Sequence, residues 1–125
     1  MKYDLIILGS GSASFGAAIK AVDLGAEVAM IEKATIGGTC VNVGCIPSKY
    51  LLRVGEINYY RNHSYAGLNV ITYLDFPAII NEKREIVEGL RKGKYEDVIQ
   101  ALGITLIKGK AVFVSDEEIG VNESI

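Results

Sequence analysis

The first 32 residues contain the feature that most constrains the fold. Residues 3–8 form a short, almost entirely apolar run, which predicts a strand buried on both faces of a parallel sheet. A glycine-rich turn over residues 9–14 leads into a helical pattern that Gly25 is expected to close. Residues 27–31 predict a second strand. This order of strand, glycine turn, helix and strand is typical of a βαβ dinucleotide-binding unit.

The turn and the second strand end in residues suited to a dinucleotide. Gly9 allows a tight turn, and Gly11 lets the backbone approach a pyrophosphate at the positive N-terminus of the helix. Glu32 follows the second strand, where a carboxylate can accept hydrogen bonds from adenosine ribose hydroxyls. Ser14 replaces the third glycine of the pattern but is still small enough for helix–strand packing. A plain tight loop and an exposed strand-end carboxylate are the alternative interpretations.

A second unusual segment, residues 37–49, contains the two cysteines of the chain, Cys40 and Cys45. On a regular helix their Cα atoms would be about 8.6 Å apart. A disulfide needs Cα atoms within roughly 7 Å of each other. Gly44 and Pro47 give reasons for irregular backbone between and after the cysteines. We therefore expect Cys40 in a loop or distorted first turn, with regular helix from about residue 46.

The neighbours of the two cysteines indicate reactive thiols. A thiol near a helix N-terminus has a lowered pKa because of the helix dipole, and Lys49 adds a positive charge. Two adjacent thiols can form a redox pair, half of a metal site or an inert pair. Inert thiols would not require glycines, Pro47 and Lys49 in this order, so a redox pair is favoured. The glycine-framed Cys40 is expected to be more open than Cys45, which adjoins the helix.

Length, charge and hydropathy exclude several classes of protein. The chain has 125 residues, enough for one domain with a core, and its mean hydropathy is +0.27. No apolar run approaches the roughly 20 residues of a membrane-spanning helix. A net charge of -2 argues against a general nucleic-acid surface, and two cysteines do not make a secreted disulfide framework. We expect a cytoplasmic protein with neither nucleic-acid nor membrane partners.

The remainder of the chain completes an α/β pattern. Asp75 is expected to cap a long helix, and Gly93 to weaken or break that helix before residues 95–102. Two strands are expected on either side of Gly109, and a further strand from Ile119. The predicted fold class is α/β, with a parallel sheet, flanking helices and the start of a small antiparallel meander.

Residues 37–49 resemble the redox-active segment of the flavin-dependent class I pyridine nucleotide-disulfide oxidoreductases. That segment reads G-G-T-C-x-N-x-G-C-x-P-S-K, and every specified position is matched. The resemblance extends from Tyr3 to about Val121. Features in residues 9–15, 51–58 and 90–95 make it closest to the mercuric reductases of this family. Dihydrolipoyl dehydrogenases share the cysteine motif almost as well.

The resemblance implies a Rossmann-like FAD-binding domain in which NADPH or NADH reduces the flavin and the flavin reduces a disulfide. It identifies Cys45 as the thiol next to the flavin and Cys40 as the interchange thiol that meets the substrate. The reduced pair could also hold Hg²⁺ transiently, because thiolates are soft ligands. The residues implied in FAD binding are Gly9, Gly11, Ser12, Ala13, Ser14, Glu32, Lys33, Gly38, Thr39 and Lys49.

Several parts of the family pattern are not found in these residues. A second glycine-rich unit for the nicotinamide cofactor is missing, as are a dimerisation domain and its catalytic histidine; His63 does not match that histidine and is expected to be a surface residue. We interpret residues 1–125 as a partial FAD-binding domain of a longer homodimeric enzyme, unable to turn over alone. The alternatives are a non-catalytic dinucleotide-binding module and a small thiol or metal-binding protein.

Overall fold

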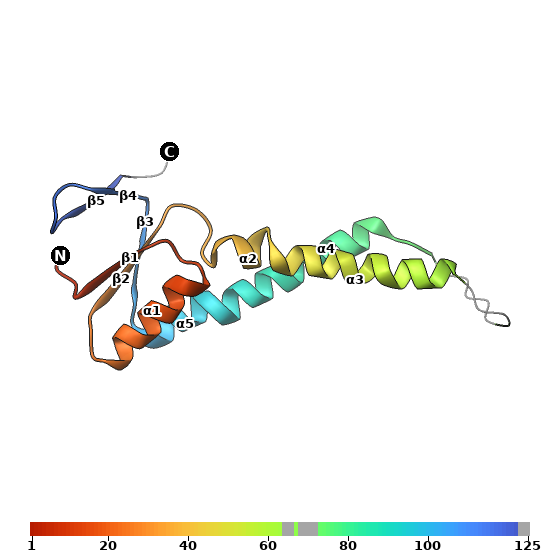
Figure 1. The fold of residues 1–125 in the computed structure, drawn as a ribbon, viewed down its shortest axis with the longest axis horizontal. Helices are drawn as coiled ribbons and strands as arrows, with labels where there is room; N and C mark the ends of the chain where they lie inside the picture. The colour runs from red at the N-terminus through yellow and green to blue at the C-terminus, as the bar shows by residue number, and fades with distance from the viewer. Residues whose placement is uncertain (64–66, 68–72, 123–125) are drawn as a thin grey trace.

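The structure is a computed structural model that describes residues 1–63, 67 and 73–122. It consists of a small α/β unit from which two long helices extend as an arm (Figure 1). Three parallel strands form the sheet in the order β1-β2-β3: β1 (Leu5–Leu8), β2 (Val28–Glu32) and β3 (Thr105–Lys108). The predicted α/β class with a parallel sheet is confirmed.

The βαβ unit forms as the sequence predicts. Helix α1 (Ser12–Asp23) connects β1 to β2, and Gly25 follows it with a φ of 86°, a conformation that favours glycine. Phe15 and Ala18 are the buried residues of α1, one helical turn apart on the face toward the sheet. Every residue of β2 is buried, as expected for the central strand of a sheet covered on both faces.

Each face of β2 is covered by a different part of the chain. Val28 and Met30 join Phe15 and Ala18 in the core, together with Ile99 of α5 (Asp97–Leu102). The opposite face packs against a two-stranded antiparallel hairpin, β4 (Lys110–Phe113) and β5 (Ile119–Asn122) (Figure 1). This hairpin is the predicted start of an antiparallel meander.

Gly109 marks the point where the chain leaves the parallel sheet for the hairpin. Its φ is 144°, and a Cβ there would lie 2.7 Å from the carbonyl oxygen of Asn122 and 2.5 Å from a methyl group of Val121. Glycine is therefore required by both conformation and space. The two strands predicted around Gly109 are present, but they belong to different sheets.

The arm consists of α3 (Cys45–Asn62) and α4 (Phe76–Arg91), which run antiparallel beside each other (Figure 1). The Tyr50 hydroxyl donates to Oε2 of Glu82 at 2.8 Å and joins the two helices. Asp75 caps α4 as predicted, accepting from the N–H of Ala78 at 3.0 Å. Among the described residues, no helix has the length and apolar character needed to cross a membrane.

The expected weak point at Gly93 is a widened helical turn and not a break. A π-helical turn, η1 (Lys92–Glu96), continues directly from α4 into α5. Such turns are often single insertions within longer helices. The helix then ends at Gly103, whose φ of 66° gives a left-handed C-cap.

Candidate functional site

The turn between β1 and α1 forms an open cradle at a helix N-terminus. Gly9 has a φ of 95°, and its N–H donates to the carbonyl of Ile31 at 2.8 Å, which fixes the turn to the sheet. Gly11 is the N-cap of α1, and no described side chain caps it. A Cβ at Gly11 would meet no atom of the described residues within 4 Å. The open space at Gly11 therefore lies beside the uncapped N–H groups at the start of α1.

The first turn of α1 has the properties of an anion site. The N–H groups of Ser12, Ala13 and Ser14 lack intrahelical acceptors by the geometry of a helix start. They lie at the positive end of the dipole of a helix 12 residues long. A pyrophosphate fits this arrangement without any further cation. These three residues and both glycines thus lie together at one helix N-terminus.

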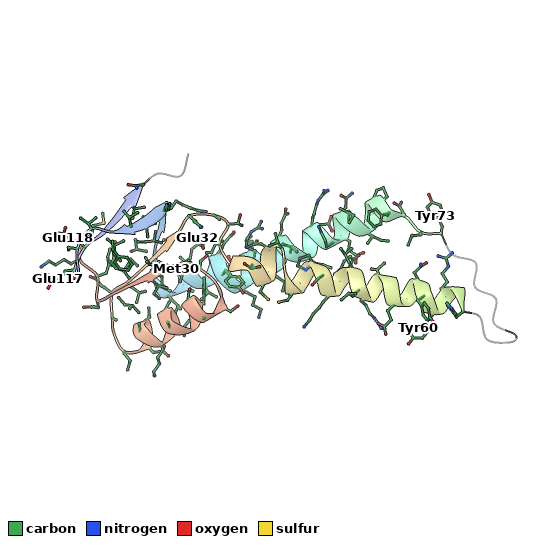
Figure 2. The ribbon with its side chains drawn as sticks, turned by 45° about the horizontal axis from the view of Figure 1, so that its top comes forward. Met30, Glu32, Tyr60, Tyr73, Glu117 and Glu118 are labelled. Carbon is green, nitrogen blue, oxygen red and sulfur yellow. The ribbon has the colours of Figure 1, made fainter. Side chains whose placement is uncertain are left out.

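Glu32 at the end of β2 is buried, only 7% exposed, and hydrogen-bonded to the glycine turn. Its Oε2 accepts from the backbone N–H of Ser10 at 3.0 Å and also from the Ser10 hydroxyl. Its Oε1 accepts from the N–H of Ala34 at 2.8 Å. Figure 2 shows Glu32 on the ribbon beyond Met30, at the end of the same strand. The exposed carboxylate of the alternative interpretation is excluded.

The ionised form of Glu32 is favoured by its surroundings. Burial alone would raise the pKa of Glu32, but three hydrogen bonds and the charge of Lys108 more than offset this. The hydrogen bonds come from the side chain of Ser10, the N–H of Ala34 and the N–H of Ser10. The pKa of Glu32 is therefore lowered from its ordinary value. A carboxylate is present here at neutral pH.

Beside Glu32, a pocket of about 290 Å³ opens at the carboxyl ends of the strands. This is the edge of an α/β sheet where ligands usually bind. Leu8 and Ile31 provide apolar wall, while Lys33 and Lys110 provide positive charge. The lining residues are Leu8, Gly9, Ile31, Glu32, Lys33, Gly109, Lys110 and Ala111. The sequence reasoning included Lys33 but missed residues 109–111; the glycine between two predicted strands was the available signal.

The second pair of glycines, Gly37 and Gly38, is pressed against the first turn. A Cβ at Gly38 would lie 2.9 Å from the Cα of Gly11, so two backbones approach as closely as glycine permits. The N–H of Gly37 bonds to the carbonyl of Ser10 at 3.1 Å and to its hydroxyl at 3.2 Å. Helix α2 (Gly38–Asn42) starts at this contact, with Thr39 exposed. The cysteine segment is thereby placed next to the cradle.

A break between two helices brings Cys40 and Cys45 together. Cys40 lies in α2, Cys45 is the first residue of α3, and the N–H groups of Val43 and Gly44 both donate to the carbonyl of Thr39. The break removes the separation that a continuous helix would impose. Both cysteines are free thiols, and they are close enough to share a hydrogen bond. The predicted irregular backbone is confirmed, although Cys40 sits in a short helix.

The surroundings of the reduced pair act in both directions on Cys40. A hydrogen bond with Cys45 raises the pKa of Cys40, and burial and the charge of Cys45 act in the same direction. The N–H of Cys45 and the charge of Lys49 oppose this but do not outweigh it. The pKa of Cys40 is therefore raised, and the lowered pKa expected from a helix N-terminus and Lys49 is wrong for this thiol.

The relative exposure of the two thiols is opposite to the prediction. Cys45 is exposed, whereas Cys40 is half-buried. Cys40 lies in α2, which packs against both α3 and α4, whereas Cys45 is the exposed first residue of α3. The assignment of the interchange and flavin-side roles to these thiols stays a prediction.

Two contacts that the sequence reasoning missed hold this segment in place. Nδ2 of Asn42 donates to the carbonyls of Ile36 and Gly38, each at 2.9 Å, while its Oδ1 accepts from Arg91 of α4 at 3.1 Å. On the other side, the hydroxyl of Tyr95 lies 3.2 Å from Oγ of Ser12. Neither Asn42 nor Tyr95 carries a local signal for a partner so distant in the chain.

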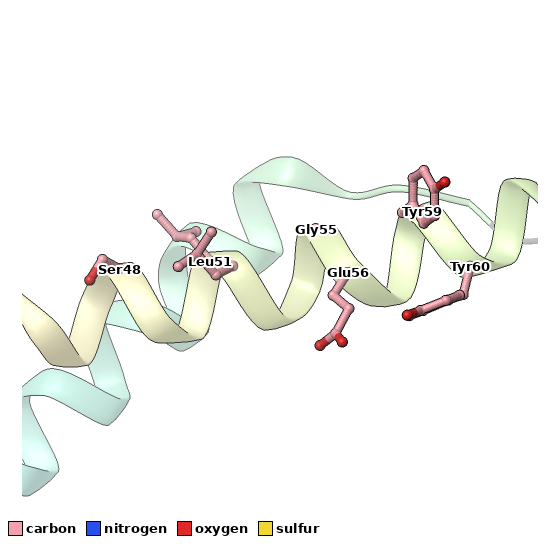
Figure 3. Close-up of a pocket in the computed structure, with 7 residues that line it drawn as sticks. Ser48, Leu51, Gly55, Glu56, Tyr59 and Tyr60 are labelled. Carbon is pink, nitrogen blue, oxygen red and sulfur yellow. The ribbon is translucent and has the colours of Figure 1, made fainter.

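Other chemical sites are not supported by the described part of the chain. It contains no group of three or more His, Cys, Asp or Glu side chains arranged to hold a metal ion. His63 is exposed and stacks on Tyr59 at a ring distance of 4.0 Å, which confirms it as a surface residue. A shallow apolar hollow runs along α3 from Ser48 to Tyr60 (Figure 3). It lies on the arm, apart from the cradle and the acid.

The fold and site define a dinucleotide-binding α/β protein with a pair of thiols next to the phosphate cradle. Comparison with known families identifies the class. The model of the pyridine nucleotide-disulphide oxidoreductases matches residues 3–125, and the chain belongs to this family.

The most similar relatives include several mercuric reductases. The chain is 49% identical over 122 residues to the mercuric reductase of Staphylococcus aureus, covering 96% of this chain and 22% of that protein. It is 39% identical over 122 residues to the mitochondrial dihydrolipoyl dehydrogenase 1 of Arabidopsis thaliana, covering 94% of this chain and 24% of that protein. The predicted likeness to mercuric reductases is confirmed.

A solved structure of a flavoprotein supports the fold. It is the Cu(II) complex of the HOCl-induced flavoprotein disulfide reductase RclA from Escherichia coli, with a TM-score of 0.80 and 30% sequence identity. The match covers 98% of this chain and 25% of that one. The chain thus spans about a quarter or less of the length of these proteins.

Proposed function

We propose that this chain is the FAD-binding and redox-disulfide portion of a flavin-dependent NAD(P)H oxidoreductase whose substrate is mercuric ion. The observation that carries the proposal is the contact of Gly38 with Gly11, where a Cβ would lie 2.9 Å from the opposing backbone. It joins the phosphate cradle to the helix that contains Cys40. The identity to mercuric reductases favours mercuric ion over other substrates.

The residues present fit FAD at two positions. The first-turn N–H groups of α1 and the open space at Gly11 suit the pyrophosphate. Glu32 is charged, and its Oε1 accepts one hydrogen bond from the described residues, which leaves a second lone pair for a ribose hydroxyl. The pocket beside it, lined by residues 109–111 and Lys33, has room for the rest of the adenosine. We include Thr39 and Lys49 on the flavin side.

When bound, the flavin would supply two-electron transfer between a nicotinamide cofactor and the cysteine pair. The chain's own contribution is to hold Cys40 and Cys45 where they can exchange dithiol for disulfide. Oxidation of the dithiol releases two electrons and two protons, and conversion of Hg²⁺ to Hg⁰ consumes two electrons. Two thiolates are also suitable soft ligands for Hg²⁺.

Uptake of FAD by the purified chain tests the proposal. We expect stoichiometric FAD binding, which can be measured by the quenching of flavin fluorescence. Gly11→Ala should weaken binding about tenfold or more, because an added methyl group would overpack the ligand's space. Since the φ of Gly11 is −77° and its Cβ would touch no described atom within 4 Å, the fold should tolerate the change.

Gly16→Ala is the matched control. Gly16 lies in the same helix, exposed, with no described atom within 4 Å of a Cβ. It should leave FAD affinity unchanged. Failure of the unsubstituted chain to bind FAD would overturn the proposal. Equal losses of FAD affinity in both variants would show that the turn at Gly11 does not bind the pyrophosphate.

A disulfide substrate is the second candidate, favoured by the 39% identity to a dihydrolipoyl dehydrogenase. The full-length enzyme distinguishes the two candidates by NADPH-dependent loss of Hg²⁺ against NAD⁺-dependent oxidation of dihydrolipoamide. Cys40→Ser and Cys45→Ser should abolish either activity. Full activity in both variants would instead support a non-catalytic dinucleotide-binding module.

The proposal extends to the context of the whole enzyme. We take it to be a cytoplasmic homodimer that acts on a metal ion or small molecule and uses NADPH or NADH. Residues 1–125 alone would bind FAD without turnover, because they contain no second glycine-rich unit for the nicotinamide cofactor. NADPH-dependent reduction of Hg²⁺ by the purified chain would contradict this point.

A further inference from the structure

Ser10 lies between the two glycines of the cradle and was not among the residues predicted from the sequence. It is 1% exposed and, with Met30, is one of the largest fully buried side chains among the described residues. A buried hydroxyl must be hydrogen-bonded to avoid a free-energy cost. Its partners therefore show why a polar residue is at this position.

The Ser10 hydroxyl has one acceptor role and one donor role. It accepts from the N–H of Gly37 at 3.2 Å, an N–H that also bonds to the Ser10 carbonyl at 3.1 Å. Because this N–H can only donate, the hydroxyl hydrogen is directed away from it and toward Oε2 of Glu32. A Cβ at Gly37 would lie 2.5 Å from a methyl group of Val41 and 3.2 Å from the ring of Tyr95, so only glycine fits at this position.

The result is a carboxylate with one oxygen fully occupied. Oε2 of Glu32 accepts from both the N–H and the hydroxyl of Ser10, so its two lone pairs are used. Oε1 accepts only from the N–H of Ala34 among the described residues. The ligand-accepting capacity of Glu32 is thereby confined to one oxygen with a defined direction.

We propose that Ser10 is a positioning residue of the cofactor site, whose hydroxyl holds the Glu32 carboxylate charged and oriented for a ribose hydroxyl. This rests on the proposed function for its ligand, but the hold on Glu32 exists without ligand. Among the described residues, the Ser10 side chain forms hydrogen bonds with Glu32 and Gly37 and with neither the first turn of α1 nor the thiols. Its action on binding is exerted through Glu32.

A double-mutant cycle in FAD affinity tests this inference. Ser10→Ala should weaken FAD binding about tenfold at pH 7, the loss expected for a hydrogen bond to a charged acceptor. Glu32→Gln should also weaken binding. Adding Ser10→Ala to Glu32→Gln should change affinity little further, because the residue through which Ser10 acts is already altered. Two independent, additive losses would overturn the proposal.

The pH dependence of affinity gives a readout that a merely structural role would not change. In the unsubstituted chain, FAD affinity should be constant from pH 7 to pH 5, because the pKa of Glu32 is lowered. Ser10→Ala removes one of the hydrogen bonds that lower the pKa of Glu32, so the acid-induced loss of FAD affinity should begin at a higher pH than in the unsubstituted chain. The charged groups around Glu32 are Lys33, Lys108 and Lys110. The histidine of the chain, His63, is the C-cap of α3.

Ser115→Ala is the control, because Ser115 also accepts a backbone hydrogen bond, from Glu117 at 3.3 Å, in an exposed turn. It should leave affinity and its pH profile unchanged.

NMR titration of the Glu32 carboxylate in the unsubstituted chain without FAD provides a measurement that does not depend on any variant folding. Titration below the ordinary carboxyl range supports the inference, and titration at or above it overturns it. If FAD fails to bind, this titration still separates the two proposals.

Discussion

At the scale of single residues, the site depends on charges held in partly buried positions. Glu32 is ionised against the cost of burial because three hydrogen bonds and Lys108 stabilise its charge. Since the pKa of Glu32 is lower in the folded chain, it stabilises the fold above its unfolded pKa, and this contribution is lost as pH falls through the lowered value. Glu32 therefore makes the stability of the fold fall at acidic pH, in addition to its place in the site.

We expect Glu32→Gln to destabilise the fold at pH 7 by roughly 1.5–3 kcal/mol, the magnitude for hydrogen bonds to a charged group. The difference from the unsubstituted chain should shrink as pH falls below the unfolded pKa and through the lowered folded pKa of Glu32, because the carboxylate then takes up a proton. Thermal unfolding between pH 7 and pH 3 measures this. Glu56→Gln, in an exposed ion pair with Arg53, should change stability by less than about 1 kcal/mol. A difference in stability between Glu32→Gln and the unsubstituted chain that grows toward acidic pH would contradict the lowered pKa of Glu32.

The reduced thiols provide a second test at this scale. Cys45→Ala removes the hydrogen bond that raises the pKa of Cys40 and leaves Lys49 in place. The pKa of Cys40 should fall and its alkylation at pH 7.5 should accelerate, because the thiolate is the reactive form. Lys49→Gln should act in the opposite direction. Iodoacetamide labelling of the reduced chain from pH 6 to pH 10, with peptide mass spectrometry, measures both; a slower Cys40 in Cys45→Ala would refute the hydrogen bond.

At the scale of elements, the break between α2 and α3 makes the thiol pair possible. The backbone of Gly44 packs on α2, so that a Cβ would lie 2.9 Å from the carbonyl oxygen of Thr39 and 3.3 Å from the Cα of Cys40. Both neighbours are backbone atoms, which cannot move aside without shifting the helix. The length and direction of the break are therefore set by one glycine.

Gly44→Ala should destabilise the chain by about 1–3 kcal/mol, the typical cost of overpacking. It should also slow formation of the Cys40–Cys45 disulfide, because α3 must move away from α2. Gly55→Ala, within α3 and with no described atom within 4 Å of its Cβ, should instead stabilise by about 0.5–1 kcal/mol. Urea unfolding and timed thiol titration measure the two effects. Equal stabilities for the two variants would show that Gly44 is not a packing contact.

The elements themselves were largely predictable, and the reasons are local. The strands of the βαβ unit, the caps at Asp75 and Gly103, and the irregular cysteine segment each follow from residues within one or two turns. The contacts that complete the site are not local. Ser10 bonds to Glu32, 22 residues away, and Asn42 to Arg91, 49 residues away. Neither side chain belongs to a periodicity or motif that specifies such a partner. These contacts are therefore visible only in the three-dimensional structure.

The same distinction explains two of the corrections. Gly93 has a low helix propensity, which predicted a weak point, but the helix continues as a π-helical turn because Tyr95 and Ile99 pack against the core. The exposure of Cys40 was judged from its glycine neighbours in the sequence. It is reversed by α3 and α4, elements that pack on α2 from later in the chain.

At the scale of the whole molecule, much apolar surface remains uncovered. Leu52 and Tyr60 of α3 are 71% and 60% exposed and border the hollow in Figure 3. Strand β1 pairs with β2 alone among the described strands, and Leu8 at its end is 43% exposed. Apolar faces and unpaired strand edges favour association. The arm and the sheet edge thus give the chain two surfaces through which copies can adhere.

We therefore expect the purified chain to self-associate at micromolar concentration. Leu52→Gln and Tyr60→Gln should each weaken this by about tenfold, if each side chain contributes the roughly 1.5–3 kcal/mol of a fully buried apolar residue. Sedimentation velocity over a concentration series measures the effect, with Glu85→Gln on the exposed charged face of α4 as the control. A chain that stays monomeric throughout would show that the apolar face is too small to drive association. Association unchanged by both substitutions would instead place the contact at the sheet edge, where β1 still offers unpaired backbone groups.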